Sequence, residues 1–216
     1  MKYSHVLWDF NGTVLDDVST GIKAINVLLS RRKMKTLDTL EEYHAHFGFP
    51  IIEYYGRLGF DFEKEPYSRI AVEWVEEYNR FVTEATLCPG VIEANRAFRR
   101  VGARQVILSA SEKGMLMGQL NDLGIASLFD EVLGCDNIEA HGKVHIGLEW
   151  LRRTRPERAV MIGDTEHDAE VAREMGIECL LVAKGHQSKE VLSRLGVPVF
   201  DSLFEVIEYI TGHSNE

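Results

Sequence analysis

Acidic, hydroxyl and lysine side chains stand where predicted β-strands end, and these residue types can act together on a phosphate ester. Asp9 closes the first apolar run, Ser109 closes the second, and Asp164 follows the fourth. Lys143 opens a predicted helix between the latter two. In open parallel sheets, ligands bind beyond the carboxyl ends of the strands. We therefore expect these side chains to converge on one edge of a sheet.

Each residue type has a definite role in phosphoryl transfer. A carboxylate such as Asp9 can attack phosphorus and form an aspartyl-phosphate, which splits one hard displacement into two easier ones. Mg²⁺ prefers oxygen ligands, so Asp9 and Asp164 could share it. Ser109 and Lys143 would bind the equatorial phosphoryl oxygens, and Gly12 lets the backbone approach the phosphate closely. The sequence predicts a magnesium-dependent site for a small phosphorylated metabolite.

Six short β-rich runs predict the strands that carry these residues. Their apolar residues are nearly continuous rather than alternating, which is typical of strands buried on both faces. The runs cover residues 4–10, 105–109, 131–133, 159–162, 179–183 and 197–200. Helical spacing of apolar residues alternates with the later runs, over 91–101, 114–123, 144–153 and 166–175. This alternation predicts an α/β fold with a doubly wound, mainly parallel, Rossmann-like sheet.

The segment after the first strand shows no strand pattern and predicts an all-helical insert. Helical spacing is clear over residues 19–31 and again over 67–82, where a wide apolar stripe includes Val75 and Tyr78. We interpret that stripe as the core of a helical bundle. The predicted organisation is therefore a Rossmann-like catalytic core of residues 1–15 and 89–216, with a helical cap of residues 16–88.

Composition and charge narrow the range of partners. The chain has 216 residues, of which 45% are hydrophobic and 27% charged, as in ordinary globular proteins. Its net charge of −10 argues against a nucleic-acid partner, and its apolar runs are too short for a membrane helix. The three cysteines are widely spaced, which predicts neither a disulfide framework nor a CxxC metal site. We expect a cytoplasmic monomer or homodimer that binds neither nucleic acid nor membrane.

Taken together, the motifs resemble those of the haloacid dehalogenase superfamily. The pattern is an apolar strand ending in DxxGT, a strand ending in serine, a lysine, and then GDxxxD. Flanking segments are similar to the phosphoglycolate phosphatase and β-phosphoglucomutase branch. These are Gly48-Phe49-Pro50, Pro89-Gly90-Val91 and Gly185-His186. The resemblance spans the chain and implies a hydrolase with a helical cap inserted after the first strand.

The resemblance also implies roles for individual residues. Asp9 would be the nucleophile and a magnesium ligand, and the backbone carbonyl of Asn11 with the carboxylate of Asp164 would complete the protein's share of the metal shell. Asp168 would orient the lysine and the metal-bound waters. The catalytic set would be Asp9, Asn11, Ser109 and Lys143. The implied phosphate-binding residues are Gly12, Ser109, Ala110 and Lys143.

Asn11 departs from the family pattern. Phosphatases of the family carry a second Asp at this position, which protonates the leaving group and then activates water. An amide cannot exchange a proton near neutral pH, and such acid–base assistance is typically worth about 10²–10⁴-fold in rate. We still expect a phosphatase, and Asn11→Asp is expected to accelerate it. A phosphate-binding protein without turnover stays an alternative.

Another reaction on the same scaffold is a further alternative. Superfamily members that cleave phosphonoacetaldehyde lack the second Asp and use a cap lysine as a Schiff base. The predicted cap contains Lys23, Lys33, Lys35 and Lys64. We interpret Lys33 and Lys35 as solvated charges at the C-terminus of the first cap helix, where they complement the helix dipole. His167, inside the acidic motif, is expected to face solvent in the first turn of its helix.

Overall fold

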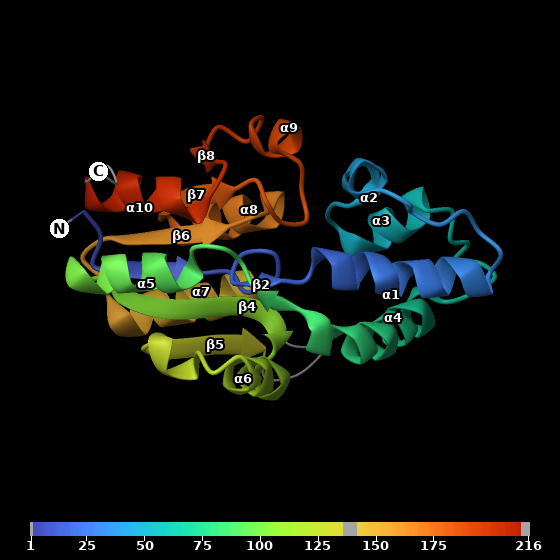
Figure 1. Cartoon of the computed structure of the whole chain (residues 1–216), viewed down its shortest axis with the longest axis horizontal. Helices are drawn as coiled ribbons and strands as arrows, with labels where there is room; N and C mark the ends of the chain where they lie inside the picture. Colours follow the sequence, from blue (N-terminus) through green and yellow to red (C-terminus); the bar gives the residue numbers. More distant parts are fainter. Residues whose placement is uncertain (1, 136–141, 213–216) are drawn as a thin grey trace.

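A six-stranded parallel sheet forms the centre of the computed structural model, which describes residues 2–135 and 142–212 (Figure 1). The strand order is β5-β4-β1-β6-β7-β8. The strands are β1 His5–Trp8, β4 Arg104–Glu112, β5 Glu131–Cys135, β6 Ala159–Gly163, β7 Glu178–Val182 and β8 Val199–Phe200. Every neighbouring pair is parallel. The predicted Rossmann-like α/β fold is confirmed.

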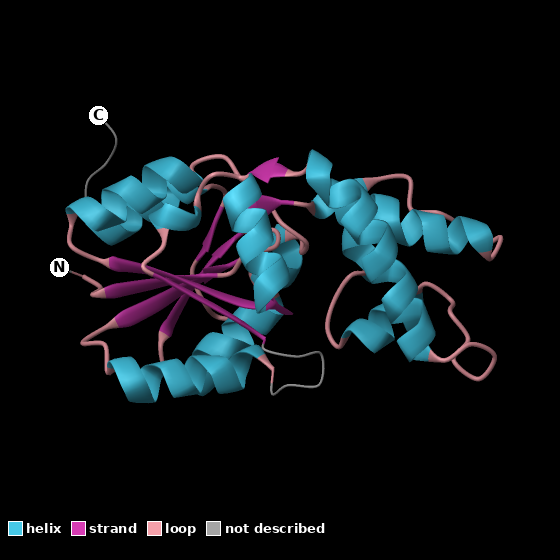
Figure 2. Ribbon diagram, turned by 90° about the horizontal axis from the view of Figure 1, so that it is seen from below, coloured by secondary structure: helices cyan, strands magenta, loops and turns pink. Residues whose placement is uncertain are grey.

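Helices cover both faces of this sheet, as Figure 2 shows. One face packs against α5 Val91–Arg100, α6 Lys113–Asp122 and α10 Leu203–Thr211. The other packs against α7 Lys143–Thr154, α8 Glu166–Met175 and the short α9 Lys189–Leu192. Short 3₁₀ turns lie at η1 Val82–Glu84 and η2 Ala126–Leu128. Both faces are buried, which explains why the strand sequences are continuously apolar.

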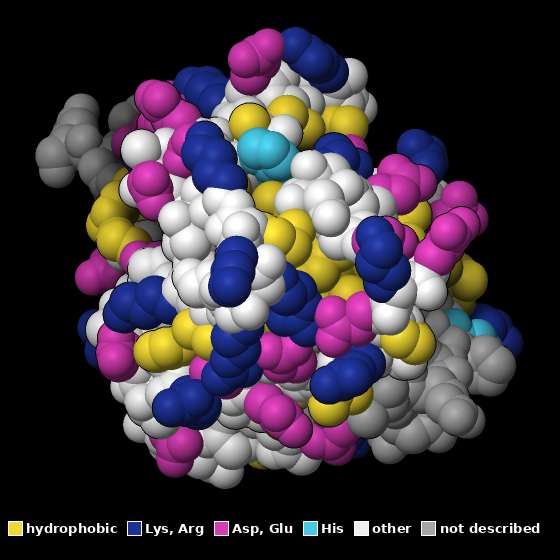
Figure 3. All heavy atoms as spheres, turned by 90° about the vertical axis from the view of Figure 1, so that its right-hand side faces the viewer, with side chains coloured by type: hydrophobic (Ala, Val, Ile, Leu, Met, Phe, Trp, Pro, Cys, Tyr) yellow, Lys and Arg dark blue, Asp and Glu magenta, His cyan; other side chains and the backbone are white. Residues whose placement is uncertain are grey.

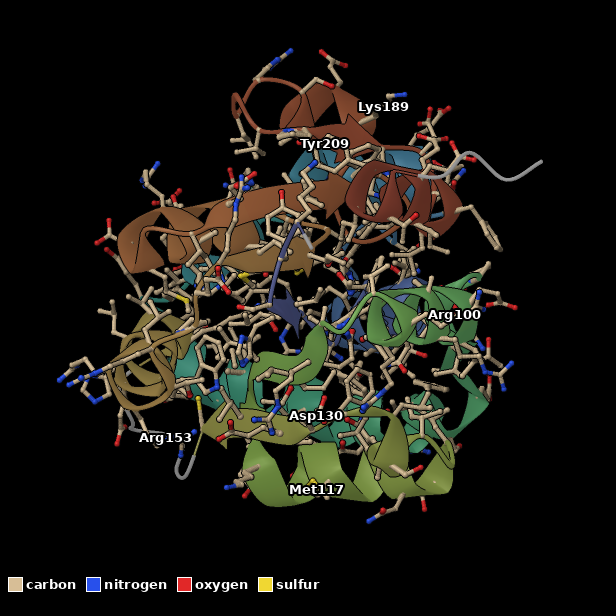
Figure 4. All side chains as sticks on the ribbon, turned by 90° about the vertical axis from the view of Figure 1, so that its left-hand side faces the viewer. Arg100, Met117, Asp130, Arg153, Lys189 and Tyr209 are labelled. Carbon is tan, nitrogen blue, oxygen red and sulfur yellow. The ribbon has the colours of Figure 1, made fainter. Side chains whose placement is uncertain are left out.

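Trp8 and Leu7 illustrate how β1 serves both layers. Leu7 belongs to the cluster under α7 and α8, whereas Trp8 lies in the opposite cluster and is wholly buried. The Trp8 indole donates to Gln105 Oε1 at 2.8 Å, so its polar atom is satisfied inside the core. Figure 4 shows the molecule from the side opposite the cap. The labelled Asp130, just before β5, accepts a hydrogen bond from the N–H of Gln105 in β4 at 2.7 Å.

Four helices between β1 and β4 in the sequence form the cap. They are α1 Val18–Arg31, α2 Leu40–His46, α3 Ile51–Arg57 and α4 Tyr67–Phe81. They share a hydrophobic cluster of their own that includes Ile25, Tyr54 and Ile70. Val75, which the apolar stripe placed in this core, is 44% exposed, because the stripe is wider than the face of α4 that packs on α1.

The prediction that residues 16–88 contain no strand was wrong at both ends of the cap. β2 Leu15–Asp16 pairs antiparallel with β3 Thr86–Leu87, so the two chain segments that join core and cap form a small sheet. A two-residue strand has no periodicity to detect, and it exists here only because its partner lies beside it. Within the described part of the chain, no helix is both long and apolar enough to cross a membrane.

Candidate active site

The site lies at the carboxyl edge of the three central strands, next to the cap (Figure 1). β1 and β6 pair in a register that aligns Trp8 with Ile162. Asp9 therefore follows β1 directly, and Asp164 follows β6 two residues beyond the aligned pair. Ser109 lies near the end of β4, on the other side of β1. The structure thus brings the three predicted strand-end residues to one edge.

Lys143 links the nucleophile position to the acidic motif. It is the first residue of α7, its side chain is 2% exposed, and its Nζ donates to Asp9 Oδ1 at 2.5 Å and to Asp168 Oδ1 at 2.6 Å. Burial alone would lower the pKa of the Lys143 ammonium, but Asp168 and Asp9 outweigh it and raise the pKa above its ordinary value. The lysine is therefore held charged and oriented between two carboxylates.

Asp168 is held by donors on both of its oxygens. Its Oδ2 accepts from the N–H groups of Asp164 and Thr165 and from the Thr165 hydroxyl, in the capping box that begins α8. Burial would raise the pKa of Asp168, but Lys143 and these donors hold it below its ordinary value. A Cβ on Gly163 would lie 2.3 Å from the carboxyl carbon, so only glycine fits beside it. Asp168 is thus held in place where its Oδ1 accepts from Lys143 Nζ at 2.6 Å.

Asp164 is wholly buried and lies in a cradle of backbone and small residues. Its Oδ1 accepts from the Thr13 hydroxyl at 3.0 Å, and its Oδ2 accepts from the His186 N–H at 2.7 Å. A Cβ on Gly185 would lie 2.0 Å from Oδ2, and one on Gly12 would lie 2.3 Å from it. Burial raises the pKa of Asp164 to about 6, although the nearby His186 opposes this.

The donor set fits a magnesium ion. Carboxylate oxygens of Asp9, Asp164 and Asp168 lie within 4.8 Å of one another. Burial and the charges of Asp168 and Asp164 raise the pKa of Asp9, although Lys143 opposes them. Asp9 Oδ2 accepts no hydrogen bond from the described residues. Because Asp168 is saturated by donors, Asp9 and Asp164 are the carboxylates that could hold the ion, which would relieve their repulsion.

The predicted phosphate-binding residues differ in their surroundings. Ser109 is buried and its Oγ accepts from the Ser111 N–H at 3.1 Å, whereas Ala110 is exposed where the register of β4 shifts. The Gly12 N–H does not point away from the protein: it donates to Asp17 Oδ1 at 2.8 Å. With a φ of +76°, Gly12 adopts a left-handed conformation that glycine tolerates best.

Asn11 belongs to a second network, which the sequence did not reveal. Its Nδ2 donates to Asp17 Oδ2 at 2.8 Å and to the Tyr78 hydroxyl at 2.9 Å. The Tyr78 hydroxyl in turn donates to the same Asp17 oxygen at 2.7 Å. On its other side, Asn11 Oδ1 accepts from the Ser111 hydroxyl at 3.2 Å. Tyr78, which we had interpreted only as bundle core, reaches the site from α4.

His186 completes this second network. Its Nε2 lies 3.2 Å from Asp17 Oδ1, and its Nδ1 lies 2.7 Å from the Tyr43 hydroxyl on α2. Burial would lower the pKa of His186, but Asp17 outweighs it and the pKa rises to about 9. Burial would raise the pKa of Asp17, but His186 outweighs it and holds the pKa below its ordinary value. The pair is therefore a buried imidazolium and carboxylate.

Asp17 and His186 had sequence signals that we did not use. Asp17 is the second of two adjacent acids that follow Leu15 and precede the helix predicted over residues 19–31. The structure exposes Asp16 and leaves Asp17 with 1% exposure. His186 lies in one of the flanking segments that carried the resemblance, but that segment by itself suggested no partner for the ring.

The expectation that His167 faces solvent was wrong. Its ring is half-buried and stacks on Phe49 of the cap, with centroids 4.8 Å apart and an interplanar angle of 20°. Glu166 supports the same contact by accepting from the Phe49 N–H at 3.1 Å and from Gln187 Nε2 at 2.9 Å. Sequence spacing placed His167 in a first turn correctly, but the cap that covers that turn comes from residues over a hundred positions away.

The cap lysines occupy the surface, where charges of both signs are intermixed (Figure 3). Three of them pair with acids of the cap region: Lys23 with Glu84, Lys35 with Glu42 at 2.7 Å, and Lys64 with Asp61 at 2.6 Å. Lys33 has a φ of +56° just after α1 ends. In the described part of the chain, these four lysines make no hydrogen bond or ion pair with Asp9 or its neighbours.

Comparison with known proteins agrees with this geometry. A model of the family described as haloacid dehalogenase-like hydrolase matches residues 6–182. A Dickeya dadantii protein named "Probable phosphatase IndB" is 26% identical over 94% of this chain and 91% of its own. A phosphoglycolate phosphatase of Caulobacter vibrioides is 23% identical over 86% of this chain and 81% of its own.

A solved structure of a haloacid dehalogenase-like family hydrolase from Streptococcus pneumoniae has the same fold. It superposes with a TM-score of 0.81 at 22% identity, covering 96% of this chain and 98% of that one. The chain belongs to the haloacid dehalogenase-like hydrolase family. Within that family, its relatives named phosphoglycolate phosphatase agree with the branch that the resemblance predicted.

Proposed function

We propose that this protein is a magnesium-dependent phosphatase that hydrolyses a small phosphate monoester through an aspartyl-phosphate on Asp9. The observation that carries the proposal is the Asp9–Lys143–Asp168 chain of buried charges beside Asp164. The relatives named phosphoglycolate phosphatase support a small, acidic substrate. The proposal includes a cytoplasmic location, and a monomer or homodimer that binds neither nucleic acid nor membrane.

The contacts of Asp9 give each of its oxygens a task. Oδ1 is fixed by the Lys143 ammonium at 2.5 Å, which orients the carboxylate, and Oδ2 remains to attack phosphorus. The same ammonium would lie next to the phosphoryl oxygens that gain charge as the bond to the leaving group breaks. Mg²⁺ bound by Asp9 and Asp164, with the carbonyl of Asn11, would neutralise phosphoryl charge. Ser109 would bind a phosphoryl oxygen beside Ala110 and Gly12.

Asn11 restricts which leaving groups are suitable. Both hydrogens of its amide are used, one by Asp17 and one by Tyr78, so it offers no proton to the departing oxygen. A leaving group that departs as a fairly stable anion needs no such proton. We therefore propose higher activity on aryl esters than on alkyl esters of similar size.

A phosphate-binding protein without turnover is the second candidate, because the missing proton donor favours it. A phosphonatase-like reaction has no comparable support, since three of the four cap lysines pair with acids at the surface and Lys33 is exposed. Release of phosphate over many turnovers separates the first two functions. Beryllium fluoride with Mg²⁺, which mimics an aspartyl-phosphate, should raise the melting temperature in both cases because it binds only the native state.

The test is a hydrolysis screen over aryl and alkyl phosphate esters, with Mg²⁺ or with EDTA, on wild-type protein and the Asp9→Asn variant. We expect Asp9→Asn to lower kcat by roughly 10⁴–10⁶-fold, as when an enzyme loses its nucleophile. EDTA should abolish turnover by the wild type. Turnover that survives EDTA, or Asp9→Asn, would refute the proposed mechanism. A thermal shift with beryllium fluoride but no multiple turnover would favour the second candidate.

A further inference from the structure

Asp17 is surrounded by hydrogen-bond donors. Its Oδ2 accepts from Asn11 Nδ2 at 2.8 Å and from the Tyr78 hydroxyl at 2.7 Å. Its Oδ1 accepts from the Gly12 N–H at 2.8 Å and lies 3.2 Å from His186 Nε2. The residue is 1% exposed. Four donors from three parts of the chain therefore meet one buried carboxylate, and none of them is a metal ligand of the proposed site by its side chain.

We propose that Asp17 is the positioning residue for Asn11, and that positions 11 and 17 form an amide–carboxylate pair that tolerates one carboxylate only. In this pair the carboxylate is at position 17, whereas the family pattern has an acid at position 11. The structural half of the inference stands on these contacts alone. Its consequence for catalysis rests on the proposed function.

The carboxylate dictates how the amide of Asn11 is turned. An ionised carboxyl group only accepts hydrogen bonds, so the nitrogen of Asn11 must face Asp17. The amide oxygen is then directed to the opposite side, where it accepts from the Ser111 hydroxyl at 3.2 Å. Asp17 thus presents Asn11 to the substrate side as an acceptor. Ser111 adjoins Ser109 through the hydrogen bond from its N–H, so the orientation extends to the phosphate side.

Replacing Asn11 alone would break this pair. An Asn11→Asp side chain has nearly the same shape, but it would bring a second carboxylate to about the same position, where the present contact is 2.8 Å. Two hydrogen bonds donated by the amide would be lost, and like charges would meet at a buried site. From the residue type at position 11 alone, we expected Asn11→Asp to accelerate the enzyme. The contacts of Asp17 lead to the opposite expectation for the single variant.

Exchanging the two residues would restore the hydrogen bond between positions 11 and 17, while the carboxylate that faces His186 becomes an amide. In Asn11→Asp/Asp17→Asn, an amide nitrogen at position 17 can donate to a carboxylate at position 11. The amide oxygen at position 17 can still accept from the Gly12 N–H and from His186. The Tyr78 hydroxyl lies within reach of both positions, so it can donate to the relocated carboxylate. The double variant also places an acid where the family pattern has one.

A double-mutant cycle tests the pair. Melting temperatures are measured in EDTA for wild-type protein, Asn11→Asp, Asp17→Asn and the double variant, with intact masses to exclude deamidation at Asn11-Gly12. We expect each single variant to melt roughly 6–12 °C lower, and the double variant to recover at least half of the larger loss. Losses that simply add in the double variant would overturn the proposal.

Should Asp17→Asn fail to fold, a comparison of Asn11→Asp with Asn11→Ala decides the same question. Alanine removes more contacts, yet it brings no charge to Asp17. The proposal requires the nearly isosteric Asn11→Asp to melt lower than Asn11→Ala, and the reverse order overturns it. This comparison needs no variant of Asp17.

Single-turnover rates on alkyl and aryl phosphates then test the catalytic consequence. The double variant should gain about 10-fold or more over wild type on alkyl esters, with a smaller gain on aryl esters, and Asn11→Asp alone should show no such gain. An equal gain from Asn11→Asp alone would overturn the positioning role of Asp17. Coupled melting temperatures without turnover by any of the four proteins would support the pair and refute the proposed function instead.

Discussion

The two halves of the site are built from different parts of the molecule. The core half uses only residues at or near the ends of core strands and helices: Asp9, Ser109, Lys143, Asp164 and Asp168. The hinge half combines the loop after β1 and the loop after β7 with residues of the cap: Asn11, Asp17, Tyr43, Tyr78 and His186. Buried ion pairs hold both halves, but only the hinge half depends on the position of the cap.

This difference separates two requirements of a phosphatase. Under the proposed function, the core half would meet the phosphoryl group, whose charge and shape are the same in every substrate. Under the proposed function, the hinge half would meet the leaving group, which varies, and its geometry is completed by hydroxyls from α2 and α4. Changes in the core half should therefore affect all substrates alike. Changes in the cap should affect substrates unequally, and three further predictions test this separation.

Lys143→Ala is expected to have the largest effect of the three. It leaves Asp9 and Asp168 as unpaired neighbouring carboxylates at a buried position, and it removes the cation beside the phosphoryl oxygens. We expect kcat to fall by about 10²–10³-fold on aryl and alkyl esters alike. Steady-state kinetics would measure this, with Lys23→Ala as the control, because Lys23 forms only an exposed pair with Glu84. A loss confined to one ester class would contradict the separation of the two halves.

Gly185→Ala should have an intermediate effect, through Asp164. The added Cβ would lie 2.0 Å from Asp164 Oδ2, so the carboxylate must move. We expect a loss of about 1–3 kcal/mol in the free energy of unfolding, together with a higher Mg²⁺ concentration for half-maximal activity. Thermal melts and magnesium titrations measure the two effects.

Gly118→Ala is the matched control for that variant. Gly118 lies inside α6, and a Cβ there meets nothing within 4 Å. Alanine should stabilise this helix position by about 0.5–1 kcal/mol without changing the magnesium requirement. If both alanine variants altered the magnesium titration equally, the cradle around Asp164 would not be responsible for the effect of Gly185→Ala.

Phe49→Ala should have the smallest effect, and it should depend on the substrate. It removes the stacking on His167 that joins the cap to the first turn of α8, an aromatic contact worth about 0.5–1.5 kcal/mol. We expect KM to rise by roughly 2–10-fold, to different extents for different esters, with kcat little changed. Phe204→Ala, at a side chain that is 40% exposed on α10, is the control. A uniform fall in kcat would show that Phe49 acts on the core half as well.

Several elements were predictable because their patterns are local. The helix predicted over 166–175 matches α8 Glu166–Met175, and the one over 67–82 matches α4 Tyr67–Phe81 within a residue. Strands buried on both faces left continuous apolar runs. The pair β2–β3, α2 and α3 were not predicted, because short or mixed segments carry too few repeats of either period. α10 was not predicted either, although its buried Leu203, Val206, Ile207 and Ile210 have helical spacing. Their conformation depends on what they pack against.

Strand ends determined the core half of the candidate site from the sequence alone. Asp9, Ser109, Lys143 and Asp164 each adjoin a strongly patterned strand or helix, and parallel strands bring their carboxyl ends to one edge whatever their separation in sequence. The charge requirement of a phosphate site could then be recognised from residue types. In this half, the local sequence pattern and the strand topology predict the same positions for the side chains.

Only the tertiary structure decided the hinge half. Tyr78 is 67 residues from Asn11, and His186 is 169 residues from Asp17, with no periodic pattern that relates either pair. Their contacts depend on how α4 packs against α1 and on how the cap closes over the loop after β7. Which of Asp16 and Asp17 turns inward depends on the same packing. The sequence showed that position 11 carries an amide where the family pattern has an acid. Only the fold showed that the carboxylate of Asp17 lies beside that amide.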